Sequence, residues 1–214
     1  MLKVDWCSHK AAKYAVERWH YSKSLPVSKL VKIGAWENNT FIGAVLFSRG
    51  ANRNMLKSYG LQQTEGCELT RVALNSHKAE VSRIISIAIK MLKKSFPKLR
   101  LIVSYSDTEQ GHHGGIYQAS NFIYDGAYTQ SSKATKNGRI AHKRTFNAAG
   151  IKGYTMLPAM PKHRYLMPLD KQMRKQIEPL SRPYPKRGLI EGQQIPSAEG
   201  GASPTSTLHT QVQA

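Results

Sequence analysis

A polar segment that follows a predicted buried strand carries the side chains best suited to chemistry in this chain. Residues 101–105 are apolar and partly β-branched, as expected of a strand buried on both faces. Because open α/β sheets bind ligands at the carboxyl ends of their strands, the next residues lie where a reactive site is expected. The groups there that transfer protons, bind metals or donate hydrogen bonds are Ser106, Asp107, Gln110, His112 and His113. The alternative is a polar loop with an Asx-turn at Asp107 and solvated histidines.

The elements that must position this segment are helices and strands in a recognisable order. Ser8 is a suitable N-cap for a helix over residues 8–20, and an apolar stripe predicts a long helix over residues 79–96. The polar turn at residues 37–40 predicts a hairpin. The expected strands cover residues 30–36, 41–47, 67–74 and 101–105, followed by a final pair at 122–128 and 139–146. A short helix is expected to end near residue 121, and residues 56–64 are ambiguous.

This order resembles the GNAT acyltransferase fold. That is an α/β (α+β) fold in which helices flank a mixed β-sheet, splayed between two central strands. The resemblance implies a glycine-rich turn before the long helix, where backbone amides bind the pyrophosphate of acetyl-CoA. Residues 75–83 occupy that position and contain no glycine, which argues against acetyl-CoA. Lys78, Ser82 and Arg83 are candidates for holding another phosphate-bearing donor.

The net charge points to a polyanionic partner. The 214 residues contain 32 Lys and Arg against 13 acids, a formal charge of +19, and self-repulsion of this size favours binding to nucleic acid. An acidic membrane is the second candidate, but no basic amphipathic helix supports it. No apolar run is long enough to cross a bilayer, and the N-terminus lacks a signal peptide. We therefore expect a soluble, cytoplasmic protein with Cys7 and Cys67 as reduced thiols.

The excess of basic over acidic residues is uneven, because residues 126–214 hold 14 Lys and Arg against four acids. The densest segment surrounds a predicted turn at Asn137-Gly138, and tyrosines near it suit base stacking or strand packing. The residues expected to bind DNA are Arg49, Arg53, Tyr124, Lys133, Lys136, Arg139, Lys143 and Arg144. Beyond residue 178, proline, glycine and polar residues dominate. We therefore expect one catalytic domain over residues 1–178 and a disordered tail over 179–214, basic at first and then of low complexity.

Four segments together resemble the Mom family of phage proteins. They are Arg18–Pro26, Lys29–Glu37, Glu68–Leu74 and Tyr105–Ser120, and the likeness extends from about Trp6 to Asp170. Members of this family modify adenine in DNA and protect the phage genome from host restriction. The resemblance implies a GNAT-like fold, double-stranded DNA as partner and action in the cytoplasm of the host bacterial cell. The implied product is adenine with a carbamoylmethyl (glycinamide) group on N6.

The resemblance also implies a set of catalytic residues. Together with the neighbouring Ser106, they are His20, Tyr21, Arg71, Asp107 and Tyr117. From residue type alone, His20 is a base, a ligand or a cation at a helix end, and Tyr117 is either functional or packed in the core. Asp107 suits a base, a metal ligand or an orienting carboxylate. Arg71 lies in an apolar strand and is expected to meet an anion.

The implied reaction needs an exposed base, a proton acceptor and an activated carbon. Adenine N6 is a weak nucleophile, so the base is expected to flip out and stack on Tyr21, Tyr117 or Tyr124. Asp107 or His20 would accept the proton. Alternatively, the glycine nitrogen displaces the adenine amine. The donor is open between acetyl-CoA and a glycyl carrier such as charged tRNA.

A metal is a further expectation, because the resemblance raises iron as a cofactor. His20, Asp107 and His113 make a candidate two-histidine, one-carboxylate site, which suits Fe(II). Two other functions compete with DNA modification. The fold order favours a GNAT-type acyltransferase acting on a protein or a small amine, and the charge alone favours a non-catalytic DNA-binding protein.

Overall fold

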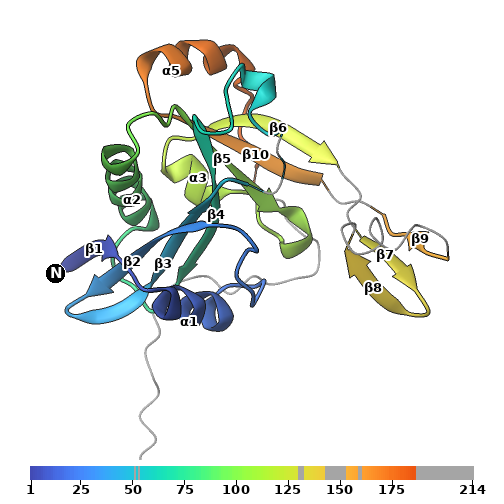
Figure 1. Ribbon diagram of the computed structural model, residues 1–214, viewed down its shortest axis with the longest axis horizontal. Helices are drawn as coiled ribbons and strands as arrows, with labels where there is room; N and C mark the ends of the chain where they lie inside the picture. Colours follow the sequence, from blue (N-terminus) through green and yellow to red (C-terminus); the bar gives the residue numbers. More distant parts are fainter. Residues whose placement is uncertain (51, 53, 130–132, 143–152, 159–160, 187–214) are drawn as a thin grey trace, which may run out of the picture.

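The chain folds around a seven-stranded sheet, with a separate three-stranded sheet beyond one end of it (Figure 1). The computed structural model describes residues 1–186 apart from 51, 53, 130–132, 143–152 and 159–160. The strand order of the large sheet is β1-β2-β3-β4-β5-β10-β6, and that of the small sheet is β8-β7-β9. No helix in the described part of the chain is both long and apolar enough to span a bilayer.

Four antiparallel strands form the first half of the large sheet. They are β1 (Leu2–Trp6), β2 (Leu30–Glu37), β3 (Thr40–Ser48) and β4 (Gly66–Leu74). The predicted β2–β3 hairpin is confirmed, with Asn38 and Asn39 in the left-handed conformation that such two-residue turns require (φ 49° and 66°). β1 was not expected from the sequence. It pairs with β2 and makes one edge of the sheet.

Two predicted helices cover opposite faces of this half. The Ser8 side chain accepts the Ala11 N–H at 3.1 Å and starts α1 (His9–Trp19). α1 packs on alternate β3 residues, Ala44 and Leu46, whereas α2 (Val81–Ser95) shares a core with Val45 and Phe47. Since successive strand residues point to opposite faces, the two helices enclose the sheet between them.

The sheet is splayed between β4 and β5 (Leu101–Asp107), as the resemblance to the GNAT fold implied. These parallel strands pair from Gly66 opposite Leu101 to Leu69 opposite Ser104, and the pairing ends there. Beyond that point β4 pairs with β3, and β5 pairs with β10 (Pro161–Pro168). The carboxyl ends of β4 and β5 therefore diverge, and the side chains that follow Leu69 and Ser104 line the seam.

The predicted final strand pair is wrong. β6 (Ile123–Thr129) pairs with β10, which was not expected, and β10 inserts between β5 and β6. The segment expected to pair with β6 instead supplies β8 (Arg139–His142), which pairs with β7 (Lys133–Lys136) in the small sheet. β9 (Thr155–Met156) is the third strand of that sheet. Periodicity identifies strands but does not say which distant strands pair. The wrong partner predicted for β6 and the failure to predict β10 therefore have the same cause.

Short helices complete the domain. They are the 3-10 turns η1 (Lys57–Tyr59), η2 (Thr108–Gln110) and η3 (Glu178–Leu180), and the α-helices α3 (Gly115–Ala119) and α5 (Lys171–Ile177). Gly114 precedes α3 with φ 78°, and a Cβ there would lie 2.3 Å from the Tyr165 ring, so this position needs glycine. A second core, which includes Tyr59, Leu166 and Ile177, lies on the face of the sheet under α5.

The first residues of the predicted tail are held against the sheet. The Arg182 N–H donates to the Tyr124 carbonyl at 2.9 Å, and the Tyr184 hydroxyl donates to the Phe122 carbonyl at 2.6 Å. Residues 179–186 thus contact β6 and the turn before it. The remainder of the predicted tail, 187–214, lies outside the described residues.

Candidate active site at the splayed strands

Two buried polar atoms without hydrogen-bond partners lie beyond the point where the pairing between β4 and β5 ends. A β-bulge at Thr70 precedes Arg71, whose Nη1 donates to the Thr70 carbonyl at 2.8 Å while Nε has no partner. Ser106 is 5% exposed, and its Oγ also lacks a partner. In the described part of the chain these are the two buried side-chain atoms left unsatisfied. Since buried polar groups are normally paired, each of the two atoms is a candidate partner for a polar ligand.

His20 follows α1 directly and is held as a neutral ring. Its Nδ1 accepts the Ser22 backbone N–H at 3.1 Å, so the proton of the neutral ring lies on Nε2. Burial, followed by the positive charges of Arg71 and His112, lowers the pKa of His20 to about 4. His20 is therefore a weak base near neutral pH, and the group it offers to a ligand is an N–H donor.

Tyr21 presents an exposed aromatic ring beside His20. The two ring centroids lie 4.3 Å apart, and the centroid of the His112 ring lies 5.3 Å from that of Tyr21 in a T-shaped arrangement. Partial burial and the Asp107 charge raise the pKa of Tyr21, whereas Arg71 and Lys162 oppose that shift. Tyr21 is 46% exposed, which leaves part of its surface available for stacking on a planar group.

Asp107, the last residue of β5, is fixed by two contacts. Its Oδ2 accepts from Lys162 Nζ at 2.9 Å, and its Oδ1 accepts the Glu109 N–H at 3.2 Å and caps η2. Lys162 lies directly opposite Asp107 in the β5–β10 register. Lys162 was not among the predicted site residues, because β10 itself was not predicted.

Two predicted residues prove to be core aromatics. Tyr117 is 8% exposed and packs against Phe122 and Tyr165, with centroids 5.4 and 5.0 Å away, and burial raises its pKa to about 12. Tyr124 is also 8% exposed, and its hydroxyl lies 2.8 Å from His163 Nδ1. The prediction that these rings stack on adenine, and that Tyr124 contacts DNA, is therefore corrected. Of the three candidates, Tyr21 retains an exposed ring.

The predicted iron ligands do not assemble. Within the described residues, no three His, Cys, Asp or Glu side chains are grouped closely enough to hold a metal ion. His20 Nδ1 is bonded to Ser22, and the Asp107 carboxylate is paired with Lys162. His113 lies near His163, where burial and then the His113 charge lower the pKa of His163. The two-histidine, one-carboxylate arrangement therefore does not fit this chain.

The family profile decides the relationship of the chain to known proteins. The sequence profile of the Mom protein family matches residues 1–186, which contain all the elements described above. This chain belongs to the Mom protein family. The methylcarbamoylase Mom of Escherichia phage Mu is 26% identical to it over 203 residues, covering 86% of this chain and 84% of the phage Mu protein.

The fold of this Mom-family member is similar to that of acetyltransferases, which confirms the GNAT-like architecture. The aminoglycoside acetyltransferase AAC(6')-Ib, solved in complex with coenzyme A and kanamycin, superposes with a TM-score of 0.51. The superposition covers 83% of this chain and 99% of the acetyltransferase at 10% identity. The same enzyme with coenzyme A alone also gives a TM-score of 0.51, at 9% identity.

The turn before α2 in this Mom-family chain is organised around a carboxylate of its own. Glu37 accepts the backbone N–H groups of Lys78 and Ala79 at 2.9 and 2.5 Å, and these bonds lower the pKa of Glu37. The side chains of Lys78 and Arg83 are exposed, and that of Ser82 is half-buried. Donor binding by Lys78, Ser82 and Arg83 remains a prediction, and Glu37 already satisfies two amides of the turn.

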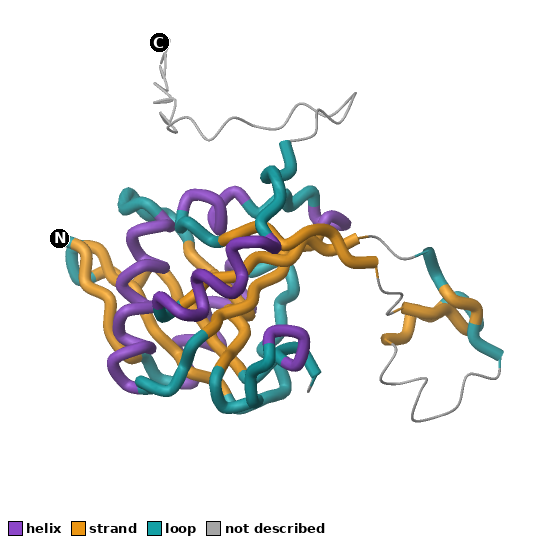
Figure 2. Tube along the Cα trace, turned by 90° about the horizontal axis from the view of Figure 1, so that it is seen from above, coloured by secondary structure: helices purple, strands orange, loops and turns teal. Residues whose placement is uncertain are grey.

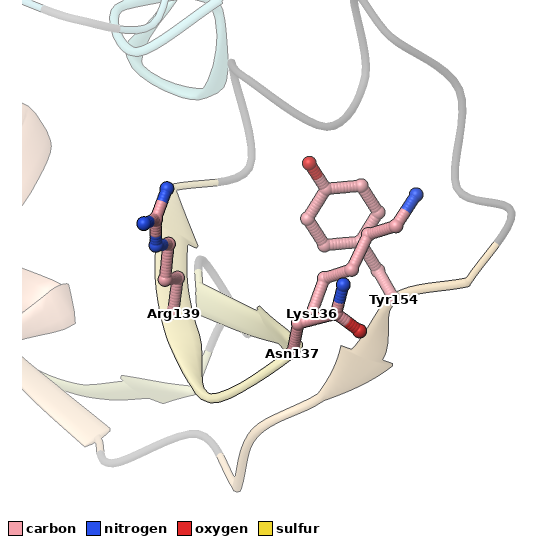
Figure 3. A pocket seen from close by; sticks show the side chains of 4 residues that line it. All are labelled: Lys136, Asn137, Arg139 and Tyr154. Carbon is pink, nitrogen blue, oxygen red and sulfur yellow. The ribbon is translucent and has the colours of Figure 1, made fainter.

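The predicted DNA-binding residues fall into three groups. Lys136 and Arg139 flank the β7–β8 turn, and with Asn137 and Tyr154 they line an open hollow of about 440 Å³ on the small sheet (Figure 3). Arg49 is exposed in the loop after β3. The positions not described, in backbone or in side chain, are Arg53, Lys133, Lys143 and Arg144. The predicted hairpin is confirmed, with Lys136 opposite Arg139.

Proposed function

We propose that this Mom-family chain modifies adenine in DNA by placing a carbamoylmethyl group on the exocyclic N6. Family membership, the named activity of the phage Mu relative and the formal charge of +19 support this function. The observation that carries it is the convergence of His20, Tyr21, Arg71 and Asp107 on the seam between β4 and β5. Contacts and mutual charge effects connect these four residues although they come from three separate segments.

In the proposed reaction the target adenine leaves the DNA stack and its ring lies on Tyr21. With a glycyl carrier as donor, N6 forms a bond to the methylene carbon while the bond from that carbon to the glycyl amine breaks and ammonia leaves. The ammonia then displaces the carrier from the carboxyl carbon, which leaves the carboxamide. Asp107 accepts the proton that N6 loses, and the contact with Lys162 holds the carboxylate in place. In the alternative route, the glycine nitrogen attacks the adenine ring and the original amine leaves.

The hydrogen-bond donors that have no partner are suited to binding the molecule that supplies the carbamoylmethyl group. Arg71 Nε and Ser106 Oγ supply hydrogen bonds to an anionic or carbonyl oxygen of the donor, and His20 Nε2 supplies a third. A donor of the coenzyme A type is supported by the coenzyme A in the structurally similar acetyltransferase, and a glycyl carrier such as charged tRNA is the other candidate. We place the activity in the cytoplasm of a phage-infected bacterium, where it protects phage DNA from restriction.

Mass spectrometry of nucleosides tests this function. Genomic DNA from bacteria that express the chain is digested to nucleosides and compared with DNA from cells that carry an empty vector. A heavier deoxyadenosine with the mass of the carbamoylmethyl adduct is expected with the chain alone. Ordinary deoxyadenosine in both samples, with the protein folded and abundant, would overturn the proposal.

A second function is favoured by the fold, namely acyl transfer to a small amine or a protein. The GNAT-like architecture supports it, and Glu37 at the turn before α2 counts against coenzyme A binding there. Calorimetry with acetyl-CoA separates the two functions. Tight binding together with unmodified DNA would favour acyl transfer to another acceptor.

A further inference from the structure

The small sheet is attached at the edge of the large sheet where the candidate site lies. Its strands β7, β8 and β9 lie in the connection between β6 and β10, whose paired ends are Thr129 and Pro161. The next residue, Lys162, pairs with Asp107 at the carboxyl end of β5. Figures 1 and 2 show the small sheet standing clear of the large one, beyond the ends of β6 and β10. A ligand held by the small sheet is thus held on the side of Asp107.

The charge of this part of the chain is of one sign. Residues 126–169 contain no Asp or Glu, although the whole chain has 13. Their basic residues are Lys133, Lys136, Arg139, Lys143, Arg144, Lys152, Lys162 and Arg164. Arg164 is paired with Asp125 and Lys162 with Asp107, so the positive charge that remains lies in the connection. Uncompensated charge of this density is suited to a row of phosphates.

The hairpin is shaped to present that charge. Asn137 and Gly138 form a tight turn with φ 51° and 73°, and Lys136, Asn137 and Arg139 are exposed around it. Lys136 Nζ lies 5.2 Å from the centroid of the Tyr154 ring, which positions the stem of the lysine. Figure 3 shows Lys136, Tyr154 and Arg139 along the same side of the hairpin. A two-stranded ribbon of this kind fits the major groove of B-form DNA.

We propose that β7, β8 and β9 form a clamp for the phosphate backbone of double-stranded DNA and hold the duplex beside the splayed site. Lys136 and Arg139 neutralise phosphates, while Asn137 and Gly138 at the tip approach the groove. This proposal rests on DNA being the substrate and adds the element that binds it. Binding of the duplex and modification of the base are then performed by different parts of the fold.

The test is the salt dependence of duplex binding, measured by fluorescence anisotropy with a labelled double-stranded oligonucleotide. The double variant Lys136→Ala/Arg139→Ala is compared with Lys10→Ala/Lys90→Ala, which removes the same charge from exposed positions on α1 and α2. The slope of log K against log salt is expected to become shallower by about 1.8 in the clamp variant, about 0.9 for each lost phosphate contact. The control is expected to keep the wild-type slope.

Equal slopes for the wild type and the clamp variant would overturn the clamp. Because the mutated side chains are exposed, the melting temperature of both variants is expected to equal that of the wild type. The experiments can refute the clamp and the proposed function independently of each other. Modified adenine with an unchanged slope refutes the clamp alone, whereas a shallower slope with unmodified DNA refutes the reaction alone.

Discussion

Lys162 Nζ lies 2.9 Å from Asp107 Oδ2 although 55 positions separate the two residues in the chain. The contact exists because β10 returns antiparallel to β5 and places the two residues opposite each other at the end of the strand pair. It fixes the carboxylate at the point where the sheet opens. The same strand also carries the chain back from the small sheet, so the proposed clamp is connected directly to the strand that holds the candidate base.

Replacing Asp107 with asparagine is expected to abolish most adenine modification. If Asp107 accepts the N6 proton, the amide cannot replace it, and a general base contributes about 10²- to 10⁴-fold to the rate. The measurement is the yield of modified deoxyadenosine per amount of folded protein.

Asp170 provides a matched control for this substitution. It also caps a helix, accepting the Met173 N–H at 2.7 Å, and it pairs with Arg100 at 2.9 Å, away from the splayed seam. Asp170→Asn is expected to lower the melting temperature while keeping the modification yield. Equal losses of yield in both variants would mean that Asp107 has a structural role.

Ser106→Ala is expected to separate activity from stability. Its hydroxyl is buried without a partner, so removing it leaves the melting temperature unchanged or raises it. Loss of a hydrogen bond to the donor should lower the rate by about 10- to 100-fold. Ser104→Ala is the comparison, because that hydroxyl donates to the Leu69 carbonyl at 2.8 Å and its loss should cost about 1 kcal/mol of stability. A less stable Ser106→Ala protein with full activity would contradict this assignment.

The neutral state of His20 predicts a loss of stability in mild acid. Its pKa is lowered to about 4 in the fold from 6.5, so below pH 6.5 the unfolded state binds a proton that the folded state does not. Stability is therefore expected to fall as the pH drops from 6.5 to 4, by at most roughly 3 kcal/mol, and this contribution is constant below pH 4. Urea unfolding of the wild type and of His20→Gln across this range isolates the contribution. Parallel pH profiles of the two proteins would refute the neutral histidine.

A buried ion pair on the face of the sheet that α5 covers is expected to stabilise the fold. Asp125 Oδ2 accepts from Arg164 Nε at 2.5 Å and from the Tyr59 hydroxyl at 2.8 Å, and the Arg164 guanidinium lies 3.7 Å from the Tyr128 ring centroid. Arg164→Met leaves a buried carboxylate without its cation, which should cost about 3–5 kcal/mol. Tyr59→Phe removes a single hydrogen bond and should cost about 1 kcal/mol. A loss for Arg164→Met no larger than that for Tyr59→Phe, measured by urea denaturation, would contradict this role.

The parts of the fold that the sequence predicted correctly depend on local signals. Ser8 caps α1, the paired asparagines turn the β2–β3 hairpin, and Asn137-Gly138 turns β7 into β8. What it did not predict depends on distant pairing. The position of β10 in the sheet, and with it the contact of Lys162 with Asp107, follows from a chain return that no periodicity records.

For the candidate site, residue type indicated the location but not the state of each group. Tyr117 and Tyr124 are of a residue type suited to stacking, yet their rings are buried in the core, Tyr117 from α3 and Tyr124 from β6. Histidine is a residue type suited to act as a base, but the hydrogen bond from the Ser22 backbone N–H to Nδ1 leaves His20 as a hydrogen-bond donor through Nε2. Such roles depend on burial and on hydrogen-bond partners, which a single sequence does not specify.

The most direct measurement compares the deoxyadenosine of cells that express the wild type, Asp107→Asn or Asp170→Asn, by nucleoside mass spectrometry at matched levels of folded protein. A carbamoylmethyl adduct is expected in the wild type and in Asp170→Asn, with at least a 100-fold decrease in Asp107→Asn. Equal adduct levels in all three would contradict an active site at the splayed strands, and ordinary deoxyadenosine in all three would contradict DNA modification itself.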